Sequence, residues 1–94
     1  MALQFTWDPK KAAANERKHG IGFPEAATAF GDPYSLTIPE PAHSVGEERC
    51  VLLGLSQRER RLVVVHVERE ADVIRIIPAR RATRHERTLD EEEV

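Results

Sequence analysis

The sequence predicts an α+β domain of two layers, in which helices pack on one face of an antiparallel sheet. Three observations lead to this fold class. Residues 49–56, 62–67 and 73–77 are runs of β-type residues, and within the last run Ile74 and Ile76 alternate with Arg75 at the period of two that is typical of a half-buried strand. Short polar segments separate these runs, as in hairpins. The first third of the chain instead shows helix caps and apolar spacings of three and four. The predicted order of elements is β-α-α-β-β-β-β-α, in a single domain over residues 1–94.

The first predicted helix is marked at both ends. It follows a short strand at residues 3–6 and begins after Asp8, a preferred N-cap, with Pro9 at the first helical position. Basic residues occupy its last turn, and Gly20 suits the position just after a helix. The centre of this helix is an Ala triplet with little apolar bulk, so we expect Trp7 to fill the core beside it.

A second helix is expected from about Pro24 to Gly31. Its apolar residues fall at i, i+3, i+4 and i+7 and form one stripe, made of Phe23, Ala26, Ala27 and Phe30. The β-type runs that follow lie at residues 34–38, 49–56, 62–67 and 73–77, with a loop over residues 39–48. Within the run 62–67, the odd-numbered valines share one face and the even-numbered residues, His66 included, share the other.

The end of the chain combines a helix start with a strong charge pattern. Thr83 followed by Glu86 is a capping box, which predicts a helix from Thr83. Residues 58–87 hold nine Arg against five acidic residues, whereas residues 88–94 hold four acidic residues and no base. We expect the latter to form an acidic, disordered tail. The sheet face that the helices leave open is therefore predicted to be basic, although a solvated face without a function is the simpler explanation of such a charge run.

Composition excludes several classes of protein. Cys50 is the only cysteine, so no intramolecular disulfide forms. The N-terminal residues lack the pattern of a signal peptide, and no apolar run reaches membrane-spanning length, so we expect a cytoplasmic protein with no membrane contact. The four His and the single Cys show no metal-ligand spacing, and we predict neither a metal nor a cofactor. Eleven Arg against three Lys favour a site for phosphate groups, because guanidinium matches phosphate oxygens bidentately.

Several short motifs succeed one another along nearly the whole chain: Phe5-x-Trp7-Asp8, Lys18-His19-Gly20, Phe23-x-Glu25-Ala26-Ala27 and Ile74-Arg75-Ile76-Ile77-x-Ala79-Arg80-Arg81-Ala82. Each alone is weak, but their ordered succession resembles the BrnT-type toxins of bacterial type II toxin–antitoxin systems. The resemblance implies a RelE-like ribonuclease fold, translation inhibition by metal-independent RNA cleavage and a cognate antitoxin of the BrnA type. Operator DNA would be bound only through that antitoxin. Two positions depart from the family pattern, since Pro78 replaces a more usual Ser and Leu89 a more usual aromatic residue.

Metal-free RNA cleavage requires a base for the 2′-hydroxyl proton, a cation for the charge on the phosphorane and an acid for the leaving 5′-oxygen. Arginines suit the second role and histidines the proton transfers. The candidate catalytic residues are Arg75, Arg80, Arg81, His19 and His66. Further contacts with RNA are expected from Arg60, Arg61, Lys18 and Arg84.

Each candidate also has a purely structural explanation. The arginines after the last strand could pair with Glu86 or with the acidic tail. His19 suits the negative end of a helix dipole, and His66, beside valines in mid-strand, suits a half-buried structural role. One strand register would place His66 and Arg75 on the same face, but the sequence does not decide the register. The alternative function is a non-catalytic RNA- or protein-binding module with an arginine-rich face.

Overall fold

The computed structural model describes residues 3–40, 48–69 and 72–93, the last five by their backbone alone. The elements in chain order are β1 (Gln4–Thr6), α1 (Pro9–His19), α2 (Phe23–Thr28), the 3-10 turn η1 (Ala29–Gly31), β2 (Leu36–Pro39), β3 (Arg49–Leu55), β4 (Arg61–Glu68), β5 (Val73–Arg81) and α3 (Arg84–Glu93). This is the predicted order of strands and helices. None of the helices in the described ranges is long and apolar enough to cross a membrane.

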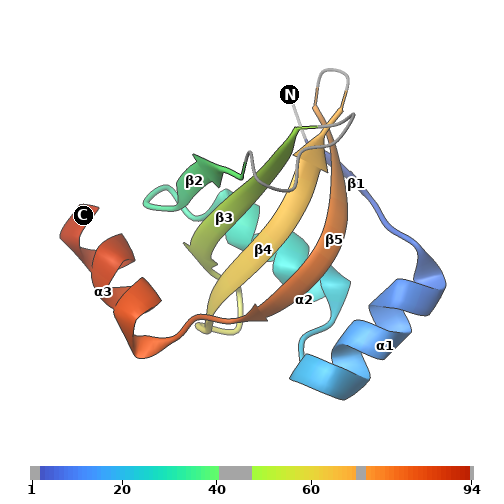
Figure 1. Ribbon diagram of the computed structural model, residues 1–94, viewed down its shortest axis with the longest axis horizontal. Coiled ribbons are helices and arrows are strands. Elements are labelled where there is room, and N and C mark those ends of the chain that lie inside the picture. The colour runs from blue at the N-terminus through green and yellow to red at the C-terminus, as the bar shows by residue number, and fades with distance from the viewer. Residues whose placement is uncertain (1–2, 41–47, 70–71, 94) are drawn as a thin grey trace.

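The sheet has five strands in the order β1-β5-β4-β3-β2 (Figure 1). Strands β2 to β5 form the predicted antiparallel meander. The prediction of a wholly antiparallel sheet is wrong at one edge, because β1 pairs with β5 in parallel, from Gln4 opposite Val73 to Thr6 opposite Arg75. No hairpin joins these two strands, so chain connectivity does not impose an antiparallel direction on them.

Helix α2 lies behind the sheet in Figure 1 and covers one of its faces. The core between them consists of Ile21, Phe23, Ala26 and Ala29 against Leu52, Leu62, Val64, Ile74, Ile76 and Ala79. The predicted apolar stripe of the second helix is confirmed, since Ala27 and Phe30 also pack against this core. Trp7 is half-buried, and its ring meets the ring of Phe23 edge to face at a centroid distance of 5.9 Å. The face of the sheet that α2 does not cover is called the open face below.

Helix α1 is attached to β5 by one buried amide side chain. Asn15 donates through Nδ2 to the carbonyl oxygens of Ile21 (3.0 Å) and Ala79 (2.8 Å), and its Oδ1 accepts from the N–H of Ala79 (3.1 Å). Because β1 pairs only with residues 73–75, the outer edge of β5 has no strand beside it at Ala79. Asn15 supplies the missing hydrogen-bond partners there, and it thereby sets where the end of α1 lies relative to β5.

Strand β5 is longer than predicted, since it continues to Arg81 instead of ending at residue 77. Ala79 pairs with Val64 and Ile76 with His66, so that two residues of β5, Ile77 and Pro78, stand opposite Val65 alone. This bulge accommodates Pro78, whose missing N–H would disrupt a regular ladder. Beyond the bulge the strand alternation resumes.

The predicted ends of α1 and the predicted start of α3 are confirmed, whereas α2 ends at Thr28 and the 3-10 turn η1 continues to the predicted end at Gly31. Asp8 accepts from the backbone N–H groups of Lys10 (2.8 Å) and Lys11 (3.4 Å) at the start of α1. The capping box of α3 is present in both directions, since Thr83 and Glu86 each accept a backbone N–H from the other. Helix α3 continues to Glu93, so most of the stretch expected to be a disordered tail is helical. Most of the predicted loop over residues 39–48 lies outside the described residues.

Candidate active site

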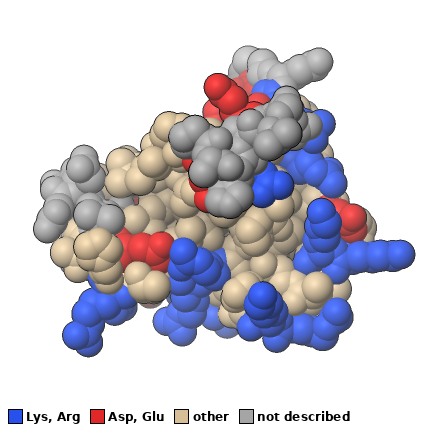
Figure 2. Space-filling view, in the orientation of Figure 1, with Lys and Arg blue, Asp and Glu red and all other residues tan. Residues whose placement is uncertain are grey.

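A hollow of about 490 Å³ opens on the face of the sheet that α2 leaves uncovered. Its floor is apolar and consists of Val51, Val63, Val65 and Pro78, while its polar groups come from His19, Glu40, Arg80 and Glu86. Figure 2 shows this face, with Lys and Arg side chains along its lower margin and right-hand side. The hollow thus combines an imidazole, a guanidinium and two carboxyl groups over an apolar base.

Arg80 is held in the hollow by Glu86. Its NH1 and NH2 groups donate to Glu86 Oε1 and Oε2, each at 2.8 Å, and NH1 also donates to the carbonyl of Arg81 at 3.3 Å. The hydrogen bonds from Arg80 lower the pKa of Glu86 to about 2, and the same pair raises the pKa of Arg80. Both groups are therefore charged at neutral pH. The ion pair proposed as a structural explanation for Arg80 is confirmed. Among the described residues, Glu86 accepts from two of the five guanidinium N–H bonds of Arg80 and the carbonyl of Arg81 from a third.

Three different elements bring the polar groups of the hollow together. His19 is in the last turn of α1, where the helix cap at Gly20 ends the helix. Arg80 reaches the open face because it pairs with Val63, a residue of the hollow floor. Glu86 is oriented by the capping box at the start of α3. His19 supplies the imidazole of the hollow, and imidazole is the side chain that most often transfers protons in enzymes.

A second, smaller hollow of about 180 Å³ lies at the edge of the sheet. Arg60, Arg61, Arg81 and Arg87 line it, together with Leu55, Glu59 and Ala82. Arg81 is directed here because it pairs with Leu62, on the opposite face from Arg80. Arg80 and Arg81, which are both candidate catalytic residues, therefore do not lie in one site, because consecutive residues of a strand point to opposite faces.

Arg60 is engaged by a buried carboxylate. Glu25 Oε2 accepts from Arg60 Nε at 2.9 Å, Glu25 Oε1 accepts from Arg60 NH2, and the Ser56 hydroxyl donates to Glu25 Oε2 at 2.7 Å. The hydrogen bonds from Arg60 are the main cause that lowers the pKa of Glu25. Arg60 therefore joins the turn between β3 and β4 to α2, and this role explains its position without any ligand.

The remaining arginine and lysine candidates lie outside the main hollow. Arg75 pairs with Val67 on the open face, four residues along β4 from Val63. That separation is roughly 13 Å at the usual rise of a strand. Lys18 is exposed in the last turn of α1, and Arg84 is exposed at the start of α3. These three side chains surround the hollow at a distance and do not line it.

His66 lies on the other face of the sheet. It pairs with Ile76 and Cys50, has no exposed surface, and its ring meets that of Phe30 edge to face at a centroid distance of 4.8 Å. The register that would place His66 beside Arg75 is not the one observed, because Arg75 pairs with Val67 instead. The structure therefore separates His66 from His19 and Arg80.

Three residues that shape the hollow have a role there that their sequence patterns did not indicate. Glu86 was identified only as a helix cap and as an ion-pair partner, although its carboxylate orients Arg80. Glu40 follows a strand with no local motif around it, and no pattern in the sequence pointed to it. The burial of Asn15 and its hydrogen bonds to Ala79 were not predicted. A lone Asn within an Ala-rich helix is nevertheless a signal for a buried polar contact.

Comparison with known proteins identifies the family. Residues 7–86 match the model of a family described as "Ribonuclease toxin, BrnT, of type II toxin-antitoxin system". The fold is similar to the crystal structure of the Brucella abortus ribonuclease toxin BrnT, with a TM-score of 0.68 and 18% sequence identity over 88% of this chain and 100% of that chain. No curated protein matches the chain. A type II system pairs its toxin with an antitoxin protein, and a ribonuclease toxin acts on RNA. Because the family match spans most of the sequence, the chain belongs to the BrnT family of ribonuclease toxins of type II toxin–antitoxin systems.

Proposed function

We propose that the hollow on the open face binds and cleaves RNA without a metal ion, and that this cleavage inhibits translation. The observation that supports this best is that His19 and Arg80 line one hollow although they are 61 positions apart in the chain. An imidazole and an oriented guanidinium are two of the groups that phosphodiester cleavage needs. The apolar floor provides a surface against which a ribose or a base could pack.

In the proposed reaction the 2′-oxygen attacks the adjacent phosphorus and the bond from phosphorus to the 5′-oxygen breaks. Neutral His19 takes the proton of the 2′-hydroxyl, and the imidazolium can then return it to the leaving 5′-oxygen. Arg80 stabilises the charge on the phosphorane through its two unused N–H bonds. Glu86 orients Arg80 and is not the acid, because a carboxyl with a pKa of about 2 carries no proton to donate at neutral pH.

The other candidates take positioning or binding roles in this proposal. Arg75, Arg81, Lys18 and Arg84 would contact phosphates on either side of the scissile bond. Arg81 is exposed, and no described residue hydrogen-bonds to its side chain, so its guanidinium is available to a ligand. Arg61 lines the same smaller hollow and adds positive charge there. His66 and Arg60 take no catalytic part, because the first is enclosed in the core and the second is engaged by Glu25.

We further propose that the partner is a BrnA-type antitoxin, that operator DNA is contacted only through it, and that the toxin acts in the cytoplasm. We also assign the fold to the RelE-like class, with which a two-layer domain and a basic open face agree. An inhibitor of this enzyme would gain most by covering the open face, because His19 and Arg80 both lie there. A partner segment with acidic side chains would match the arginines around it.

In cells, we expect expression of the chain alone to arrest growth. Co-expression of the product of the adjacent gene should relieve this arrest. His19→Ala and Arg80→Ala should each abolish the arrest. His85→Ala serves as the matched control, because His85 is an exposed histidine outside the hollow. RNA cleaved by the purified chain should carry a cyclic phosphate, and the cleavage should persist in the presence of a chelator.

The alternative function is a binding module with an arginine-rich face. It predicts normal growth at high, verified soluble expression. It also predicts that the parent chain binds RNA without cleaving it and that Arg80→Ala weakens this binding. That combination would contradict the toxin. Growth arrest that survives both His19→Ala and Arg80→Ala would instead place the active site outside the hollow.

A further inference from the structure

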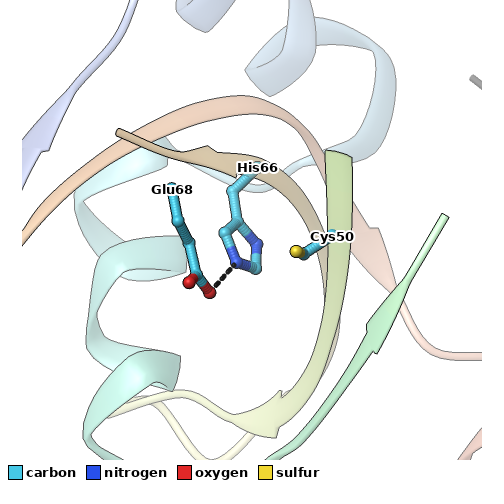
Figure 3. Close-up of side chains that lie close together, drawn as sticks. All are labelled: Cys50, His66 and Glu68. Atoms are coloured by element: carbon cyan, nitrogen blue, oxygen red, sulfur yellow. Dashed lines mark hydrogen bonds and ion pairs between the residues drawn. The ribbon is translucent and has the colours of Figure 1, made fainter. Parts of the chain in front are cut away.

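Three side chains with metal-binding atoms meet on the helix-covered face of the sheet. Cys50 and His66 are paired across β3 and β4, and Glu68 follows His66 by two residues on the same face. The sulfur of Cys50, a ring nitrogen of His66 and a carboxylate oxygen of Glu68 all lie within 4.8 Å of one another. Figure 3 shows the imidazole between the carboxylate and the sulfur.

The imidazole of His66 has a defined orientation. Its Nδ1 lies 3.2 Å from the carbonyl oxygen of Val64, and because a carbonyl only accepts, Nδ1 bears the proton in this contact. The ring of Phe30 packs edge to face against it at an interplanar angle of 77°. A histidine that donates through Nδ1 to a backbone carbonyl presents the lone pair of Nε2 to a ligand, which is the arrangement common among metal-bound histidines.

The Nε2 lone pair faces the carboxylate of Glu68, which also only accepts hydrogen bonds. Nε2 of His66 lies 3.3 Å from Oε2 of Glu68, and an ionised carboxylate has no proton to donate. Two acceptors at this distance repel each other unless a cation lies between them. A proton between them would bridge only these two groups. A metal ion would engage Cys50 as well.

We propose that Cys50, His66 and Glu68 form a binding site for a divalent transition-metal ion, of which Zn²⁺ is the best match. Zn²⁺ accepts thiolate, imidazole and carboxylate ligands together. Tetrahedral coordination at the usual bond lengths separates a nitrogen and an oxygen ligand by roughly 3.3 Å, the distance found between His66 and Glu68. The Cys50 sulfur lies within 4.8 Å of the other two ligand atoms, which is at most roughly 1 Å farther than tetrahedral coordination requires.

The surroundings of the cluster favour a cation and give it access. Burial is the main cause that raises the pKa of the Cys50 thiol, and the carboxylates of Glu68 and Glu48 raise it further. These two carboxylates are negative charges that would attract a cation to the cluster. On binding, the thiol proton is released to solvent and the thiolate becomes a ligand. Glu68 is 55% exposed and Cys50 is half-buried, so an ion can enter from the outer side of the cluster. The fourth position is left for water.

This site lies across the sheet from the hollow that contains His19 and Arg80. Its ligands are on the face of β4 that carries Leu62 and Val64, whereas the hollow floor uses Val63 and Val65. A bound ion would therefore join β3 to β4 and stabilise the fold without taking part in RNA cleavage. The sequence analysis predicted no metal, because 15 residues separate Cys50 from His66 and no local spacing reveals the pair.

The test uses the full chain, produced without a histidine tag and freed of metal by dialysis against a chelator. Titration with Co²⁺ should give a thiolate-to-metal charge-transfer band that saturates at one equivalent. Cys50 is the only cysteine, so this band can report no other site in the chain. Zn²⁺ should displace Co²⁺ and should raise the melting temperature by about 10 °C when its free concentration is a hundredfold above Kd.

Cys50→Ser should remove the charge-transfer band, and Glu68→Gln should weaken Zn²⁺ binding at least about tenfold. Both positions have exposed surface and should tolerate these substitutions, unlike the enclosed His66. Glu16→Gln is the matched control, because Glu16 is an exposed carboxylate on α1, and it should bind as the parent chain does. Absence of the band in the parent chain, or equal Zn²⁺ affinity in the parent chain, Cys50→Ser and Glu68→Gln, would overturn the proposal.

Discussion

Replacing Asn15 by Ala should destabilise the domain strongly, although the substitution removes only the carboxamide group of one side chain. Asn15 is 7% exposed and takes part in three hydrogen bonds, two to carbonyl oxygens and one from the N–H of Ala79. Truncation leaves one buried N–H and two buried carbonyl groups without these partners. Each such group costs about 1–3 kcal/mol. Some of this cost is recovered where water enters.

We therefore expect the free energy of unfolding to fall by about 3 kcal/mol, out of the roughly 5–10 kcal/mol of a domain of this size. The higher helix propensity of Ala returns only about 0.6 kcal/mol. For an m-value of about 1.5 kcal/mol per molar urea, the midpoint should fall by roughly 2 M. Hydrogen exchange offers a local readout, because the amide of Ala79 should lose its protection first.

Two further variants sharpen this prediction. Asn15→Asp retains an acceptor for the N–H of Ala79 but directs a carboxylate at the carbonyl oxygens of Ile21 and Ala79, so it should be at least as destabilising. Lys11→Ala, at an exposed position on the same helix, should change stability by less than about 0.5 kcal/mol. A loss below about 1 kcal/mol for Asn15→Ala, or wild-type stability for Asn15→Asp, would refute the reasoning.

Three other predictions follow from particular contacts. The pKa of Glu86 is lowered to about 2 from its ordinary value of 4.5, so its contribution to stability is present above about pH 4.5 and is lost as the pH falls towards 2. Because Arg80 is 42% exposed, solvent screening reduces this contribution to about 1 kcal/mol. Urea unfolding at about pH 6 and about pH 3 should show that Glu86→Gln loses less unfolding free energy on acidification than the parent chain does. Equal losses in the two proteins would contradict a stabilising ion pair between Arg80 and Glu86. Gly54→Ala would place a Cβ 2.9 Å from the carbonyl oxygen of Ala29 and should cost about 1–3 kcal/mol in thermal or urea unfolding, whereas Gly31→Ala, with open space around it, should be close to neutral. Arg81→Ala should lower the slope of the logarithm of the RNA-binding constant against the logarithm of the salt concentration by about 0.7 in magnitude. Arg60→Ala should leave this slope unchanged, because Glu25 already engages the Arg60 guanidinium, and equal effects of the two variants would contradict this difference.

Local chemistry made much of the fold predictable from the sequence. Asp8, Pro9 and Gly20 mark the ends of α1 because capping depends on neighbouring backbone groups alone. The capping box at Thr83 and Glu86 was readable for the same reason. Period-two alternation located the central strands and assigned the even-numbered residues of β4 to one face. The ordered motifs also indicated the family, which the match over residues 7–86 confirms.

Pairing across the sheet was decided only by the tertiary structure. The parallel edge strand β1 and the bulge at Ile77 and Pro78 depend on contacts between segments far apart in the chain, which no local pattern encodes. The bulge extends β5 as a strand and thereby sends Arg80 and Arg81 to opposite faces. Strand alternation is a local rule, but where the alternation starts is set by register, and a shift of one residue exchanges the faces.

The same reason explains the fates of the two candidate histidines. His19 lines the hollow with Arg80 because Asn15 attaches α1 to β5 at Ala79, a contact between residues 64 positions apart. His66 is enclosed on the other face because it pairs with Ile76 and Cys50. The sequence by itself determined the residue types available, the helix ends and the strands. Which of those residues meet in one site was determined by long-range pairing, whose free energy comes from the whole packed sheet and not from any one segment.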